Sequence, residues 1–245
     1  MKTFGGYGAQ LYRIKNPFYK LLLSIFYPPA PFINCISNHQ KEIIKRHIFT
    51  HNARVLDIGS GISKGPGKWL WANENDLSIT VVRMDICAGP TVDVVCDATK
   101  MPADIGLFDS VVLQSVPEHI QDIFLLFKQI DIILKPNGYI YIEMPFLQGM
   151  HGDPSDYWRT TNHGLAYLVN NYDVVLYGVS GGPVGSLNWI ISDLLSNIFT
   201  SDKLNLLVRF LTRWLLSPLR YLDLFLLNKR CAERLACENF ILAKK

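Results

Sequence analysis

Short apolar runs alternate with longer helical patterns over most of the chain from residue 54 onward. The runs are rich in β-branched and aromatic residues and have the length of strands. They are Arg54–Ile58, Ile79–Met84, Val92–Val95, Ser110–Leu113, Tyr139–Met144, Val174–Val179 and Glu238–Ala243. Helical patterns cover Lys68–Asn73 and Ile120–Leu134, and Lys135-Pro136-Asn137-Gly138 after the second is a helix stop and turn. This alternation predicts a mainly parallel sheet covered on both faces.

Two further helical patterns precede the last of these runs. They cover Leu187–Phe199 and Leu204–Leu227, and Pro218 should kink or break the second. Three arginines of the second share one helical face, and they are Arg209, Arg213 and Arg220. No apolar stretch reaches the roughly 18 to 20 residues of a spanning helix. We expect either an amphipathic helix that lies on a membrane through residues 204–227 or a cap over the sheet or a second subunit.

Charge is distributed unevenly along the 245 residues. The net charge is +3, but residues 51–202 carry 8 basic and 17 acidic side chains, whereas residues 1–50 carry 7 and 1 and residues 203–230 carry 6 and 1. The hydrophobic share of 49% excludes disorder for most of the chain. Flanks that are both basic and apolar favour an anionic membrane surface over nucleic acid, so we expect no nucleic-acid partner.

The cysteines indicate a reducing compartment. There are five, an odd number, with no CxxC pair and no histidines at zinc-finger spacing. The N-terminal apolar run comes late and ends in Pro28-Pro29, unlike a signal peptide. We therefore expect a cytoplasmic protein, at the inner face of a membrane if the basic flanks bind lipid.

The first strand runs directly into a Gly-x-Gly turn, Gly59-Ser60-Gly61. Two glycines let the backbone approach a ligand closely. The dinucleotide fingerprint would need glycine where the chain has Lys64, and a phosphate loop would need Ser or Thr where it has Trp69. The turn therefore suits an adenosyl ligand without phosphates. Asp85 and Asp97 follow the next two strands, where carboxylates can accept hydrogen bonds from ribose hydroxyls and an adenine amino group.

Five segments in order carry a resemblance to a known family. They are VLDIGSG, RMDI, CDATKMP, FDSVVLQSVPEHI and ILKPNGYIYIEMP. Together they resemble the class I S-adenosylmethionine-dependent methyltransferases, in particular the small-molecule group called type 11, over Ala53 to Leu168. The resemblance implies an α/β, Rossmann-like, doubly wound sheet of seven strands, parallel except for an antiparallel last strand. It also implies an enzyme that uses S-adenosylmethionine.

The resemblance assigns the glycine turn to the methionine part of the cofactor. Gly59, Ser60 and Gly61 would pass beneath it, and Asp57 would brace the turn. The chain departs from the family at Ser63, where many members have glycine, and in the irregular sequence Lys64-Gly65-Pro66-Gly67.

The resemblance assigns the adenosyl part to the ends of the following strands. Asp85 would hold the ribose hydroxyls and Ile86 would pack on the adenine. Asp97 with Ala98 would meet the adenine amino edge, and Gln114 would lie near the sulfonium.

Candidate catalytic residues follow the fourth and fifth strands. His119 lies at the start of the helix expected after the fourth strand, where it would act in catalysis, cap the helix or pack against it. His151, Asp156 and Arg159 belong to the loop after the fifth strand, and we predict His151 as a base because its ordinary pKa near 6.5 suits proton removal near neutrality. Asp156 and Arg159 would act with it or pair to anchor the loop. A metal site from His151, Asp153 and Asp156 lacks a helical frame, so none is expected.

The chain is expected to divide into four segments. These are an apolar, basic N-terminal segment (1–50), the cofactor-binding core (51–182), a helical insertion (183–230) and the last strand (231–245). The acceptor would be a small molecule, a sugar or a lipid-linked glycan, methylated on oxygen, and a homodimer is a further expectation. Two other classes stay open: a non-catalytic membrane-associated module with this fold and, less favoured, a nicotinamide-dependent oxidoreductase.

Overall fold

The computed structural model describes residues 28–61, 69–71, 78–151 and 155–245. The chain divides into two compact units, which we call the sheet unit and the helical unit. The sheet unit comprises Ile36–Met144, Arg159–Gly178 and Asn239–Lys245. The helical unit comprises Met1–Cys35, Pro145–Trp158 and Val179–Glu238. The four-segment division by sequence stays a prediction.

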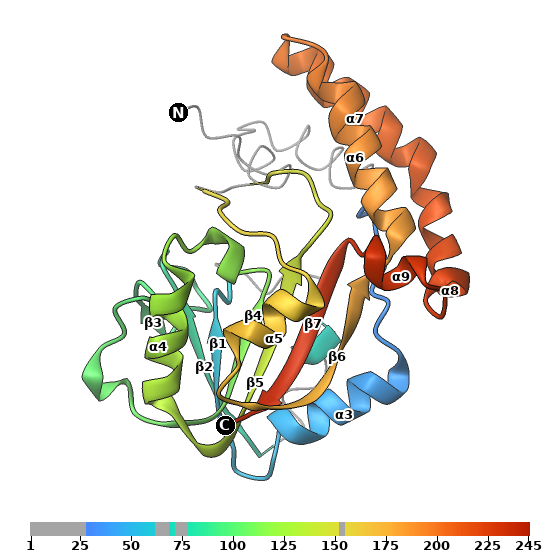
Figure 1. The fold of residues 1–245 in the computed structure, drawn as a ribbon. Coiled ribbons are helices and arrows are strands. Elements are labelled where there is room, and N and C mark those ends of the chain that lie inside the picture. Colours follow the sequence, from blue (N-terminus) through green and yellow to red (C-terminus); the bar gives the residue numbers. More distant parts are fainter. Residues whose placement is uncertain (1–27, 62–68, 72–77, 152–154) are drawn as a thin grey trace. The chain divides into compact units, whose positions relative to one another are not determined.

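Seven strands form one sheet among the described residues (Figure 1). They are β1 (Arg54–Ile58), β2 (Thr80–Asp85), β3 (Val94–Val95), β4 (Phe108–Gln114), β5 (Leu134–Pro145), β6 (Asp173–Gly181) and β7 (Glu238–Lys244). The order is β3-β2-β1-β4-β5-β7-β6. β1 pairs in parallel with both β2 and β4, so the strand order reverses beside β1. Ligands of doubly wound sheets bind outside the carboxyl ends at such a point.

The last strand runs against its neighbour β5. Near the start of β5 the N–H of Asn137 donates to the carbonyl of Lys245, whereas just after its end the N–H of Phe146 donates to the carbonyl of Cys237. The residue numbers of the paired residues increase along β5 while they decrease along β7, so the two strands are antiparallel. The predicted fold class is therefore confirmed: an α/β protein with a mostly parallel seven-stranded sheet and an antiparallel last strand.

Helices cover both faces of this sheet. On one face α3 (Asn38–Ile48), capped by Ser37, buries Ile44 and Ile48 against inward side chains that include Tyr141 and Phe240. On the other face lie α4 (Ile123–Ile133) and α5 (Asn162–Leu168) (Figure 1). Each fully buried side chain of this size contributes roughly 1.5 to 3 kcal/mol, so the two layers fix the strands and hence the loops at their ends.

The helix after β4 begins later than its sequence pattern predicted. Pro117–His119 forms a separate 3₁₀ turn, η4, and Asp122 caps α4 by accepting a hydrogen bond from the N–H of Leu125 at 2.9 Å. Pro117, three residues after the end of β4, favours this short turn because it has no N–H to donate. His119 therefore lies in η4 and does not cap α4.

Two more predicted segments differ in detail. β5 already begins at Leu134, so the predicted turn over residues 135–138 lies within it as an irregularity, with Asn137 at a φ of 65°. The register between β4 and β5 shifts there, between Phe108 and Ser110. Of the predicted helix Lys68–Asn73, the structure describes the 3₁₀ turn η1 (Trp69–Trp71). A third 3₁₀ turn, η3, covers Ala103–Ile105.

The helical unit is built on an antiparallel hairpin of α6 (Pro183–Asn197) and α7 (Asp202–Leu216) (Figure 1). α7 ends two residues before Pro218, which confirms the predicted break. The chain continues through three short elements, which are η5 (Ser217–Leu222), α8 (Asp223–Leu226) and α9 (Cys231–Arg234). Among the described helices none has both the length and the apolar content needed to cross a membrane.

Candidate functional site

The turn after β1 is held against the end of β2. The N–H groups of Gly59 and Ser60 donate to the carbonyl of Met84 at 2.8 and 3.1 Å, and the N–H of Gly61 donates to Oδ2 of Asp85 at 2.9 Å. Gly59 and Gly61 have φ angles of 67° and 78°. A Cβ on Gly59 would lie 2.3 Å from Cγ2 of Val116. Backbone conformation and space therefore both require glycine at position 59.

Asp85 connects this turn to the chain beyond β2. Its second carboxylate oxygen, Oδ1, accepts the N–H of Cys87 at 2.9 Å. Each carboxylate oxygen has two lone pairs, so both can accept a further hydrogen bond from a ligand. The next residue, Ile86, exposes 68% of its surface. An oriented carboxylate and an exposed apolar side chain thus stand together at the end of β2.

Asp97 and Ala98 lie in the turn after β3. Oδ1 of Asp97 accepts the N–H of Thr99 at 2.9 Å and its hydroxyl at 2.8 Å. The N–H of Thr99, and then its hydroxyl, hold the pKa of the Asp97 carboxyl below its ordinary value. Asp97 is therefore an ionised hydrogen-bond acceptor near neutrality. Ala98 is buried beside it.

Asp57, the remaining residue expected to serve the glycine turn, is buried in β1. The bonds that hold the turn, as described above, come from Met84 and Asp85. The role of Asp57 as a brace stays a prediction. Residues 63–67, where the sequence departs from the family, lie outside the described residues.

A buried polar network joins the ends of β4 and β5. Nε2 of Gln114 donates to Oε1 of Glu143 at 2.8 Å, and the hydroxyl of Tyr141 donates to the same oxygen at 2.5 Å. Glu143 is 6% exposed, and Oε1 of Gln114 is buried with no hydrogen-bond partner among the described residues. The network fixes the Gln114 amide in one orientation and leaves its carbonyl oxygen able to accept a bond from a ligand.

Sequence reasoning missed Glu143. The signal was present, because Glu143 is the single acid in the otherwise apolar end of its strand, Tyr139–Met144. A carboxylate in a buried strand needs partners, so its position at the carboxyl end predicts a polar network there.

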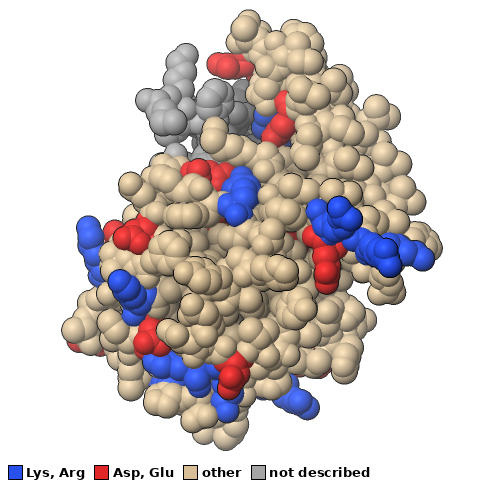
Figure 2. Space-filling view, viewed as in Figure 1, with Lys and Arg blue, Asp and Glu red and all other residues tan. Residues whose placement is uncertain are grey.

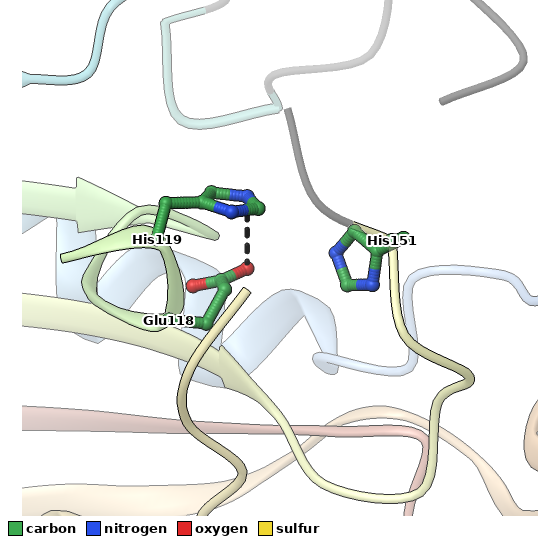
Figure 3. Close-up of side chains that lie close together, drawn as sticks. All are labelled: Glu118, His119 and His151. Atoms are coloured by element: carbon green, nitrogen blue, oxygen red, sulfur yellow. Dashed lines mark ion pairs between the residues drawn. The ribbon is translucent and has the colours of Figure 1, made fainter. Parts of the chain in front are cut away.

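Glu118 and His119 occupy the turn η4 after β4 (Figure 3). Glu118 is fully buried, and its Oε1 lies 3.9 Å from Nε2 of His119, whose side chain is 27% exposed. The imidazole and the buried carboxylate thus lie side by side in this turn. His119 therefore remains a candidate for proton transfer in the sheet unit.

His151 belongs to the helical unit, where the loop after β5 orients its ring. The backbone N–H of His151 donates to Oδ2 of Asp156 at 2.8 Å, and the ring nitrogen Nδ1 lies 3.1 Å from the carbonyl of Gly149 and 3.6 Å from Oδ2 of Asp156. Two acceptors beside Nδ1 favour a proton on that nitrogen, which places the lone pair of the neutral ring on Nε2. Trp189 of α6 packs on the ring with a centroid distance of 5.3 Å.

The other loop residues are only partly described. Asp156 has a side chain that is 1% exposed, so its carboxylate is fixed beside His151. Arg159 belongs to the sheet unit, and its pairing with Asp156 stays a prediction. Asp153, named for the disfavoured metal site, lies outside the described residues.

Comparison with known proteins identifies the sheet unit. A family model described as "Methyltransferase domain" matches residues 56–142, from β1 through most of β5. A search of curated proteins finds no match.

Solved structures with the same fold include enzymes of different chemistry. One is the [4+2]-cyclase SpnF, with a TM-score of 0.53 and 13% identity over 91% of this chain and 92% of that chain. Coclaurine N-methyltransferase, bound to N-methylheliamine and S-adenosylhomocysteine, has a TM-score of 0.53 and 13% identity over 97% and 84%. The 1,6-didemethyltoxoflavin-N1-methyltransferase of Burkholderia thailandensis, with its substrate and S-adenosylhomocysteine, has a TM-score of 0.52 and 13% identity over 98% and 88%.

At such identities the structures establish the fold alone, and the family model adds the sequence pattern of β1 to β5. Both agree with the glycine turn and the strand-end carboxylates described above. Residues 56–142 therefore form a methyltransferase domain, and the domain and the fold together indicate an enzyme whose cofactor is S-adenosylmethionine.

Proposed function

We propose that this enzyme methylates a hydroxyl group of a small-molecule, sugar or lipid-linked glycan acceptor, with His151 as the base. The observation that carries the proposal is the orientation of His151, whose Nδ1 faces the carbonyl of Gly149 and the carboxylate of Asp156. A hydroxyl group is a weak nucleophile until it loses its proton, so an oriented imidazole favours oxygen as the methylated atom. Two structural neighbours were solved with small-molecule ligands, which supports an acceptor of that size.

The residues at the carboxyl edge fit the cofactor. Glycine at position 59 lets the turn pack against Val116, and the buried oxygen of Gln114 accepts no bond within the described chain. We assign the turn Gly59–Gly61 to the methionine part and Asp85 to the ribose hydroxyls. Ile86 would pack on the adenine, and Asp97 with Ala98 would meet its amino group.

The reaction is an in-line displacement in which S-adenosylmethionine supplies an electrophilic methyl group. The acceptor oxygen forms a bond to the methyl carbon as the carbon–sulfur bond breaks, leaving S-adenosylhomocysteine. The hydroxyl proton passes to Nε2 of His151, and Asp156 stabilises the imidazolium that results. Most of the acceleration comes from holding the reactants in line, since proximity and orientation alone can supply roughly 7 to 11 kcal/mol. Arg159 would anchor this loop, and His119 is the second candidate base.

Turnover in His151→Ala tests the proposal. Methyl transfer should fall by about a hundredfold or more, the usual contribution of a general base, while S-adenosylhomocysteine affinity stays the same. His163→Ala is the matched control, because His163 is an exposed histidine on α5. Undiminished turnover in His151→Ala, with a large loss in His119→Ala, would assign the base to His119 instead.

A non-catalytic member of the family is the alternative function. The fold alone does not dictate methyl transfer, because the [4+2]-cyclase SpnF shares it. Tight binding of S-adenosylmethionine without methyl transfer to any hydroxyl-bearing acceptor would support it. A nicotinamide-dependent oxidoreductase would instead require binding of NAD.

A further inference from the structure

The α6–α7 hairpin has polar side chains inside and apolar side chains outside. The buried residues along the inner side of α6 are mostly small or polar. After Pro183 and Val184 in its first turn, they are Gly185, Ser186, Asn188, Ser192 and Ser196. The buried residue that α7 contributes is Arg213. Water-soluble helix pairs bury the opposite kind of side chain, so this hairpin has the polarity expected in an apolar surrounding.

The polar groups of this inner seam bind one another. Nδ2 of Asn188 donates to the carbonyl of Leu216 at 3.2 Å, across the hairpin. Arg209 approaches Asp193 at 3.5 Å, and its Nε donates to Ser196 at 3.3 Å. The guanidinium of Arg213 lies 5.5 Å from the ring centre of Trp189. Polar groups surrounded by hydrocarbon must find such internal partners because lipid offers none.

These contacts change the role of the arginines. The sequence pattern placed Arg209, Arg213 and Arg220 on one face of an amphipathic helix. In the structure, Arg209 and Arg213 face α6 within the hairpin, as described above. The surface that α7 presents outward is therefore its leucine face.

Both helices expose a continuous apolar stripe. On α6 it runs at helical spacing through residues 37% to 64% exposed, which are Leu187, Ile190, Ile191, Leu194, Leu195 and Ile198. On α7 the stripe is 39% to 77% exposed and consists of Leu204, Leu207, Leu211 and Leu215. On the face seen in Figure 2, the outer side of the hairpin is mostly uncharged, with charged atoms at its tip and along its inner edge.

Charges stand at both ends of the hairpin. Exposed Asp202 and Lys203 lie at the turn between the helices. Beyond the other end, segment 228–235 carries the exposed Lys229, Arg230 and Arg234 against a single acid, Glu233. Each helix has 15 residues, about 22 Å at 1.5 Å per residue, which is less than the roughly 30 Å of a bilayer core. Charges at both ends of so short an element keep both ends near lipid headgroups.

We propose that the α6–α7 hairpin embeds along the surface of an anionic membrane, at the boundary of headgroups and acyl chains. The apolar stripes contact acyl chains, the contacts described above hold the polar side chains of the inner seam, and the basic end at residues 229–234 binds anionic headgroups. A second copy of the chain would cover the stripes as well, but it would require neither the internal pairing of the seam nor the basic end. The inference does not depend on the acceptor, although a lipid-linked acceptor would lie at the same surface.

Co-sedimentation of the full chain with lipid vesicles tests this proposal. The protein should bind vesicles of phosphatidylcholine with a minority of phosphatidylglycerol, and bind pure phosphatidylcholine less well. Leu194→Glu with Leu211→Glu should reduce partitioning by about tenfold per leucine. Lys229→Glu with Arg230→Glu should remove the preference for phosphatidylglycerol. The matched control is Ile132→Glu, because Ile132 of α4 is at least as exposed, at 68% against 63% for Leu194 and 56% for Leu211, but lies outside the hairpin.

Three results would overturn the proposal. One is a native protein that ignores vesicles but forms a dimer by light scattering, with the double-glutamate variant monomeric, since the stripes would then join two copies. Another is a much lower melting temperature for the variant with Leu194→Glu and Leu211→Glu than for Ile132→Glu. Such a loss of stability would mean that other residues of the same chain cover the stripes. The last is equal loss of vesicle binding in the control. Binding of S-adenosylhomocysteine, measured in parallel, keeps these outcomes separate from failure of the cofactor site.

Discussion

Replacing Asp85 with alanine changes two sets of contacts. One is structural, because its carboxylate accepts the N–H groups of Gly61 and Cys87, both at 2.9 Å. The other is the proposed pair of bonds from the ribose hydroxyls. Alanine removes all of them, while asparagine keeps one acceptor oxygen in nearly the same place.

The size of the effect follows from the charge of the acceptor. A hydrogen bond to a charged group contributes about 1.5 to 3 kcal/mol, and 1.4 kcal/mol is a tenfold change in Kd. Loss of one such bond to the ribose should therefore raise the Kd for S-adenosylhomocysteine by roughly 10- to 150-fold in Asp85→Ala. The affinity of Asp85→Asn for S-adenosylhomocysteine should lie between that of Asp85→Ala and that of the native protein. The two backbone N–H groups at this half-exposed position can bind water, so stability should fall by only about 1 kcal/mol.

Isothermal titration with S-adenosylhomocysteine measures the affinity, and thermal unfolding measures the stability. Asp109→Ala is the control, because Asp109 accepts the N–H of Arg54 at 2.8 Å but lies at the opposite, amino end of the parallel strands. It should keep full affinity. Native affinity in Asp85→Ala would refute the placement of the ribose, and an equal loss in Asp109→Ala would show that the effect is general destabilisation.

Three further variants test the local arguments. Gly59→Ala should abolish cofactor binding in titration, since a positive φ and a contact of 2.3 Å with Val116 both oppose a side chain; unchanged binding would contradict the close approach. Glu143→Leu should weaken binding of S-adenosylhomocysteine severalfold, because Gln114 loses its bond to Glu143. Tyr141→Phe keeps the bond between Gln114 and Glu143 and should leave the affinity unchanged. Equal effects of the two variants would argue against a positioning role for Glu143. Asp223→Ala should lower the free energy of unfolding by about 1 to 3 kcal/mol in urea titration, because Val184 and Gly185 at the start of α6 lose their acceptor. Burial raises the pKa of Asp223 despite those two bonds, so its contribution to stability is present at acidic pH and is lost as pH rises through the folded-state pKa; Asp223→Asn should flatten that part of the pH profile, and an unaltered profile would exclude Asp223 as its source.

The strands were predictable because their signal is local. All seven lie where runs of β-branched and aromatic residues stand, within a few residues at each end, since a buried parallel strand must be apolar on both faces. The boundary of α4 was misjudged because Pro117 and the Asp122 cap determine it, and a periodicity pattern does not register single caps.

The site was only partly predictable. The order of glycines and acids after successive strands located Asp85 and Asp97, because parallel strands bring their carboxyl ends to one edge. Glu143 was missed, since its importance comes from partners on β4 and β5 rather than from a motif. The spacing of Arg209, Arg213 and Arg220 showed that they share one helical face. Which neighbour that face contacts depends on how α6 and α7 pack together, and the sequence of one helix does not contain that information.

The central claim, that the carboxyl edge around β1 binds S-adenosylmethionine, is tested most directly by competition binding on the purified full chain. Bound labelled S-adenosylmethionine should be displaced by S-adenosylhomocysteine and not by NAD, and Gly59→Ala should bind neither adenosyl compound. Displacement by NAD, or native binding of S-adenosylmethionine in Gly59→Ala, would contradict the account.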